Sequence, residues 1–189
     1  MGFLDTLLGR RKVQGPAPDR LFAITTAAVA LEAGPGITSA GAGAIVFQPL
    51  ATGDFQQIAR DMEEVVRGTG QETGTHLETA DDSYGYRWMV LRDPDVEDLA
   101  VGVNAVSDAL AVGGYGNRVL CAVFAFRQAD GRRVYFIYNY KRGTWYPFVP
   151  AGEQQRDTEQ ELRVKAQVGA ELPVEPELER WFPLWGAPI

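Results

Sequence analysis

Hydrophobic residues recur along this chain with two periods, one typical of strands and one typical of helices. The densest apolar stretch spans residues 118–150, where two runs rich in Val, Phe, Tyr and Ile flank the pair Asp130-Gly131. Such residues suit a pleated, half-buried surface, and Gly131 can adopt the positive φ that tight hairpin loops often need. The pattern therefore predicts a hairpin in the core of the fold.

A second hairpin is predicted over residues 75–92, with its turn around Asp81, Asp82 and Ser83. In its second strand, every other residue is a large apolar one, as expected where one face of a strand is buried. These alternating residues are Tyr84, Tyr86, Trp88 and Val90. Residues 44–50 form one further predicted strand.

Helical periodicity is strongest at residues 96–112, where apolar residues recur at heptad-like spacing before Gly113 and Gly114. Residues 55–67 form a second amphipathic helix, and a loop is expected at 68–74. A polar helix is predicted over residues 153–172, with a thin apolar side made of Leu162, Ala166, Val168 and Leu172. Asp19 can cap a helix that begins at Arg20, although residues 25–29 also suit an extended strand.

This order of elements predicts an α+β fold, with a mainly antiparallel sheet built from two hairpins plus one further strand and with helices packed on it. We expect residues 19–189 to form a single domain. The C-terminal tail is rich in Pro and Trp, and it is expected to pack on the domain because its large apolar side chains would otherwise favour aggregation. These side chains are Trp181, Phe182, Leu184 and Trp185.

Residues 1–18 are expected to form a separate segment, an N-terminal amphipathic helix followed by a linker. Four apolar residues share one helical face: Phe3, Leu4, Leu7 and Leu8. Three basic residues follow, where cations favour a helix C-terminus: Arg10, Arg11 and Lys12. The helix could dock on the core of its own domain, or it could be a detachable contact for a partner protein or a membrane surface.

Composition narrows the class of protein. The chain has 189 residues, of which 46% are hydrophobic and 23% charged, the balance of a soluble globular protein. No apolar run approaches the roughly 20 residues of a membrane span, and the N-terminus lacks the layout of a signal peptide, so a cytoplasmic location is expected. The net charge of −7 argues against a nucleic acid as partner.

Candidate catalytic groups are few. Cys121 is the only cysteine and lies in the most apolar strand, whereas a nucleophilic cysteine needs an accessible, electropositive site. His76, the only histidine, is expected at an exposed strand start. The acidic residues at 93–98 could imitate a metal site, but they precede a helix, where carboxylates serve as caps. We therefore expect no enzymatic activity, no catalytic residue, no cofactor and no metal.

The segment 141–148 follows the core hairpin and combines basic with aromatic residues. Such a combination can bind phosphates or form interface contacts. We expect Trp145 and Phe148 to enter the core, and we take Lys141, Arg142 and Tyr146 as candidate surface contacts. The alternative is a ligand-binding or enzymatic domain with a pocket near these three residues, in which a basic side chain and a carboxylate or His76 would converge.

Four stretches together resemble the PspA-associated protein PspAB of bacteria, and the resemblance spans essentially the whole chain. They are the opening MGFLDTLLGR, YGYRW at 84–88, YKRGTWYPF at 140–148 and RWFPLWG at 180–186. The resemblance implies a partner of the phage-shock protein A system, which senses and repairs damage at the cytoplasmic membrane. No catalytic residue is carried over with it.

Residues and resemblance together lead to one expectation, a cytoplasmic adaptor protein of the bacterial envelope-stress response. Its folded domain would bind a PspA-like protein. The segment 1–12 would contact that partner or the inner face of the membrane. A homodimer through an exposed strand edge or the tail is a further reading of the sequence.

Overall fold

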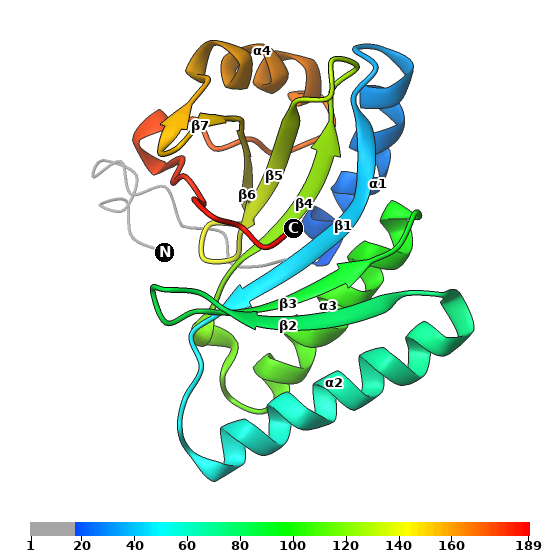
Figure 1. Ribbon diagram of the computed structural model, residues 1–189, viewed down its shortest axis with the longest axis vertical. Helices are drawn as coiled ribbons and strands as arrows, with labels where there is room; N and C mark the ends of the chain where they lie inside the picture. Colours follow the sequence, from blue (N-terminus) through cyan, green and yellow to red (C-terminus); the bar gives the residue numbers. More distant parts are fainter. Residues whose placement is uncertain (1–17) are drawn as a thin grey trace, which may run out of the picture.

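A six-stranded antiparallel sheet forms the centre of the protein (Figure 1), seen in a computed structural model that describes residues 18–189. The strand order is β2-β3-β1-β4-β5-β6. The strands are β1 (Thr38–Phe47), β2 (His76–Asp81), β3 (Arg87–Arg92), β4 (Val119–Arg127), β5 (Arg133–Asn139) and β6 (Thr144–Phe148). A separate short hairpin consists of β7 (Pro150–Gly152) and β8 (Gln155–Arg156).

Four helices pack against one face of this sheet and its edges, and the C-terminal tail crosses the other face (Figure 1). The helices are α1 (Pro18–Ala33), α2 (Gly53–Thr73), α3 (Val96–Val112) and α4 (Thr158–Val168), with short 3-10 turns η1 (Gly116–Arg118) and η2 (Leu178–Arg180). None of the helices within residues 18–189 is long and apolar enough to cross a membrane.

Burial on both faces explains why the central strands are apolar almost throughout. In β1, for example, Ile45 and Phe47 join the core under the helices, whereas Ala44 and Val46 join the core under the tail. Successive side chains of a strand point to opposite faces, so each strand supplies both cores. Trp181 and Ile189 are the buried apolar residues of the tail.

The predicted α+β fold with two hairpins is confirmed, and α3 has the predicted bounds. Asp95 caps α3 by accepting a hydrogen bond from the Glu97 N–H at 2.7 Å. The ambiguous residues 25–29 are helical, and β1 begins earlier than predicted. The predicted N-terminal amphipathic helix lies outside the described residues.

The loop predicted at residues 68–74 is wrong, because α2 continues to Thr73 and ends at Gly74. Glycine usually weakens a helix, but at position 70 of α2 a glycine is needed, because this position is buried against the chain that follows the helix. A Cβ on Gly70 would lie 2.1 Å from the backbone oxygen of Thr75. The chain thus reverses tightly against the last turn of the helix, and glycine permits that approach.

The helix predicted at 153–172 is also longer than the observed α4. Residues 150–156 form the β7–β8 hairpin, and Asp157 then caps α4 by accepting a hydrogen bond from the Gln160 N–H at 2.9 Å. This start sets the helical register, so that Glu161, Val164 and Val168 face the core. Leu162 and Ala166, predicted on the apolar side, are exposed.

Candidate functional site

The predicted surface contacts at 141–146 have three different environments. Residues 144–148 form the edge strand β6. Lys141 is exposed, in the turn that connects β5 to β6. Arg142 is half-buried and pairs with Glu175 of the tail. Lys141 is therefore the only one of the three candidates that is fully available at the surface.

Tyr146 is buried, so the expectation that it offers a surface contact is wrong. The strand register turns its side chain toward the tail, where its ring stacks on Trp181 at 6.3 Å between centroids. Its hydroxyl donates a hydrogen bond to the Phe182 carbonyl at 3.2 Å. Burial raises the pKa of Tyr146, as expected for a phenol removed from water.

Glu175 holds the tail against β6, and its side chain is only 2% exposed. It accepts hydrogen bonds from Arg142 Nε, from Thr144 Oγ1 at 3.1 Å and from the Glu177 N–H at 3.2 Å. Burial alone would raise the pKa of Glu175, but these donors outweigh it and lower the pKa below its usual value. Arg142 therefore acts here as a structural clamp.

A second buried carboxylate, Glu161 of α4, binds a second arginine. It accepts hydrogen bonds from Arg156 Nε and from the Val149 N–H at 2.9 Å. Arg156 also donates to the Trp181 carbonyl at 2.6 Å, so this pair fixes the same segment of the tail. Burial raises the pKa of Glu161, and Arg156 offsets that effect only in part.

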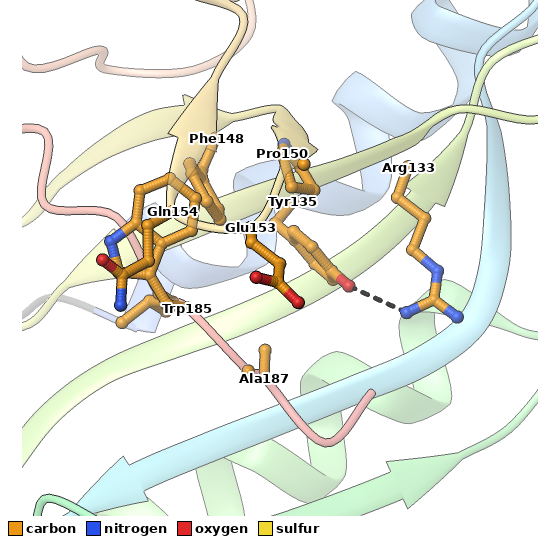
Figure 2. Close-up of a pocket in the computed structure, with 11 residues that line it drawn as sticks. Arg133, Tyr135, Phe148, Pro150, Glu153, Gln154, Trp185 and Ala187 are labelled. Atoms are coloured by element: carbon orange, nitrogen blue, oxygen red, sulfur yellow. Dashed lines mark hydrogen bonds between the residues drawn. The ribbon is translucent and has the colours of Figure 1, made fainter.

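Between the tail and the β7–β8 hairpin lies an open pocket of about 710 Å³ (Figure 2). Its floor is aromatic, because Tyr135 and Phe148 stack at 6.0 Å and Trp185 meets Phe148 edge-on at 5.1 Å. Arg133 and Glu153 supply one charge of each sign to its lining. The lining thus combines an aromatic floor with one cation and one anion.

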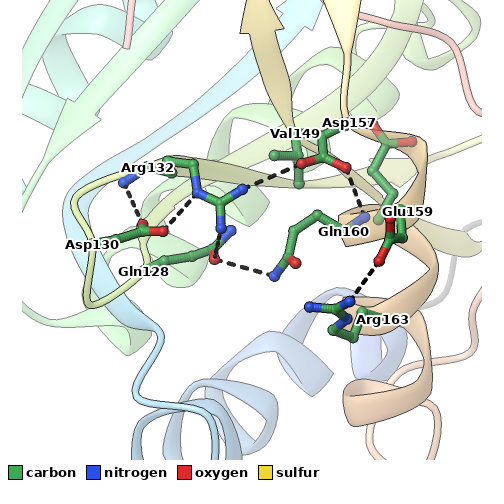
Figure 3. Close-up of polar contacts among 9 residues, drawn as sticks. Gln128, Asp130, Arg132, Val149, Asp157, Glu159, Gln160 and Arg163 are labelled. Carbon is green, nitrogen blue, oxygen red and sulfur yellow. Dashed lines mark hydrogen bonds and ion pairs between the residues drawn. The ribbon is translucent and has the colours of Figure 1, made fainter.

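Both walls of this pocket are tied to the sheet. Arg133 Nη1 donates to the Tyr135 hydroxyl at 3.2 Å and to the Ile189 carbonyl at 3.1 Å, which anchors the tail. The β7–β8 hairpin leads into α4, and Arg132 binds Asp157, the cap of that helix, at 3.2 Å (Figure 3). Asp130 in turn accepts from Arg132 Nε at 2.7 Å.

Cys121 and His76 do not meet. They lie on β4 and β2, and the strands β1 and β3 separate them. Cys121 is buried, and burial raises its thiol pKa to about 12, so almost no reactive thiolate forms at neutral pH. His76 is exposed at the start of an edge strand.

The acidic residues at 93–98 serve the start of α3. Asp93 accepts from Thr75 Oγ1 at 2.6 Å and from the Asp95 N–H at 2.8 Å. Within residues 18–189, no group of three or more His, Cys, Asp or Glu side chains could hold a metal ion. These carboxylates stabilise a loop and a helix end.

Sequence reasoning missed the residues that matter most for the tail, namely Arg156, Glu161 and Glu175. Each ion pair joins residues from different elements, and Arg142 and Glu175 are 33 positions apart. The available signal was weak: Glu175 is a lone acid between the apolar Val174 and Pro176.

No curated protein and no solved structure matches the chain. A family model described as PspA associated protein B matches residues 1–189, the whole chain, in agreement with the four stretches noted in the sequence. The chain therefore belongs to the PspAB family.

Proposed function

We propose that this protein is a non-enzymatic binding protein that associates with PspA in the bacterial response to membrane stress. Membership of the PspAB family, over the entire chain, is the observation that carries the proposal. The name of the family supports PspA as the partner. The resemblance noted in the sequence supports the response to membrane damage as the process.

The environment of the reactive groups supports binding as opposed to catalysis. Cys121 is buried and its thiol stays protonated, while Glu161 and Glu175 are committed to arginines that hold the tail. Arg142, one of the two basic side chains that a ligand site near residues 141–146 could use, is engaged by Glu175. The two ion pairs whose carboxylates are buried, Arg142–Glu175 and Arg156–Glu161, thus serve the domain's own architecture.

Pull-down of the untagged full-length protein on immobilised PspA from the same organism tests the association. We expect retention of the protein that resists washing and that a bovine albumin column does not reproduce. Retention no greater than on albumin would contradict the proposal.

We further propose that the protein works in the cytoplasm and that residues 1–12 contact PspA or the inner face of the membrane. Each basic residue near an anionic surface contributes about 1 kcal/mol, so Arg10, Arg11 and Lys12 together give weak, reversible attraction.

Co-sedimentation with vesicles that contain anionic lipid tests the membrane part of this proposal. Replacing all three basic residues by Ala should reduce binding of the full-length chain by up to roughly 100-fold, which corresponds to about 3 kcal/mol. The matched control replaces Arg163, a basic residue exposed on α4, by Ala. If wild type and the triple variant sediment equally little, only the protein partner remains.

A further inference from the structure

Helices α2 and α3 enclose an apolar groove of about 290 Å³ on their outer side. Its apolar walls are Ile58, Met62 and Val65 of α2 together with Ala105, Ala109 and Val112 of α3. Val112 is 90% exposed, an unusual environment for a valine on a helix that otherwise packs well. The helices converge at one end, where a Cβ on Gly113 would lie 2.5 Å from Ile58 Cδ1.

The rim of this groove is acidic. Asp61 lines it from α2, and Asp54 lies on the same face of that helix, seven residues earlier. On α3, Asp108 lies three residues from Ala105 and four from Val112, and residues 96–112 contain no Lys or Arg. The two arginines of α2, Arg60 and Arg67, border a different hollow together with Glu63 and Glu64. An occupant should therefore be apolar on one side and basic at its end.

The chain itself contains one segment with this combination. In residues 1–12, four apolar residues recur at helical spacing, and three basic residues follow directly. The apolar set matches the walls of the groove, and the basic set matches its acidic rim.

The connection to Pro18 is long enough for the segment to reach the groove. Helix α1 packs beside α3, and residues 25–33 of α1 line a common pocket with residues 94–97 at the start of α3. Packed helices are about 8–10 Å apart, and the five residues 13–17 can extend over roughly 17 Å. The linker can thus cross α3 from the side of α1 to the side of α2.

We propose that residues 1–12 dock as a helix in the α2–α3 groove of the same chain. This inference depends on the groove and on the sequence of the segment, and it does not depend on the association with PspA. Docking keeps Phe3, Leu4, Leu7 and Leu8 out of water in the isolated protein. A membrane or a partner must then displace the segment from the groove before it can contact the same side chains.

Disulfide trapping in the full-length protein tests the docking, with no partner present. The variant L8C/V112C places one thiol on the segment and one at the groove. The control L8C/V29C uses Val29, which is 70% exposed on α1 and lies outside the groove. Cys121 does not compete, because it is buried and its pKa is about 12. Val112 and Val29 are both exposed, so both variants should fold, and circular dichroism verifies it.

Under a mild oxidant, we expect the intramolecular disulfide of L8C/V112C to form at least 10-fold faster than that of L8C/V29C. Adding D61K should slow the first reaction and leave the second unchanged. Equal rates for the two pairs, or no effect of D61K, would overturn the proposal. A disulfide-linked dimer as the fast product would also overturn it, and would place the segment in the groove of a second copy.

Discussion

Replacing Glu175 by Ala should destabilise the domain far more than a surface substitution two residues away. The substitution removes the carboxylate that Arg142, Thr144 and the Glu177 N–H share. Loss of one partner of a buried ion pair costs about 3–5 kcal/mol, and Arg142 is partly exposed, so about 2–4 kcal/mol is expected. For a domain of this size, that corresponds to a decrease in Tm of roughly 4–16 °C.

Thermal and urea unfolding, followed by circular dichroism, measure this difference in the free energy of unfolding. Glu177→Ala is the matched control, since Glu177 contacts Arg142 and Arg180 but is 52% exposed. Exposed ion pairs contribute about 0–1 kcal/mol, so the control should remain close to wild type. A Glu175→Ala variant as stable as Glu177→Ala would refute the assignment of Arg142 as a structural clamp.

The pH dependence of the same pair gives an independent measurement. The pKa of Glu175 is lower in the folded protein than its usual value of 4.5. Its contribution to stability is therefore complete above the pKa of the unfolded chain and is lost as the pH falls through the folded-state pKa. The difference in stability between wild type and Glu175→Ala should accordingly shrink below about pH 4.5. A difference that stays constant as the pH falls would show that the charge of Glu175 is not what stabilises the tail.

Three further substitutions or reactions test the packing. Gly70→Ala should lower the free energy of unfolding, measured in urea, by more than about 2 kcal/mol, because the added Cβ would overlap a backbone oxygen. Gly68→Ala has open space around the added Cβ, so in the same assay it should stabilise the protein by up to about 1 kcal/mol. Trp181→Ala should cost about 3–5 kcal/mol in the same assay, and Phe182→Ala, at a position 60% exposed, less than about 1 kcal/mol. Cys121 should react with a thiol reagent at pH 8 only at the rate of unfolding, and an immediate reaction would contradict its burial.

Local patterns in the sequence predicted the elements whose signals lie within the element itself. Helix α3 carries an apolar stripe, a cap at Asp95 and a glycine after its end, so its bounds could be read directly. The β4–β5 hairpin was equally clear, because Gly131 has the positive φ, 83°, that its turn requires.

Other features depend on contacts between distant segments and leave no local signal. Glycines 68 and 70 predicted a loop, but packing extends α2 through them. Strands β7 and β8 have only three and two residues, too few to show alternation. Tyr146 was expected at the surface because no local pattern shows that the tail covers this face of β6, and the pairing of Arg142 with Glu175 becomes visible only in three dimensions.

The position of the tail has a consequence for how the chain is made. One face of the six-stranded sheet is covered by residues that are synthesised after all six of its strands, including Trp181 and Ile189. At about 5–20 residues per second, translation of residues 149–189 takes roughly 2–8 s after β6 is complete. Any part of the sheet that forms before residues 173–189 emerge lacks its own cover over Val46, Val123 and Ile137. The time for which chaperones must protect this apolar face during synthesis should therefore depend on how soon the tail is made. Binding of chaperones to the nascent chain should increase when translation slows within residues 149–189.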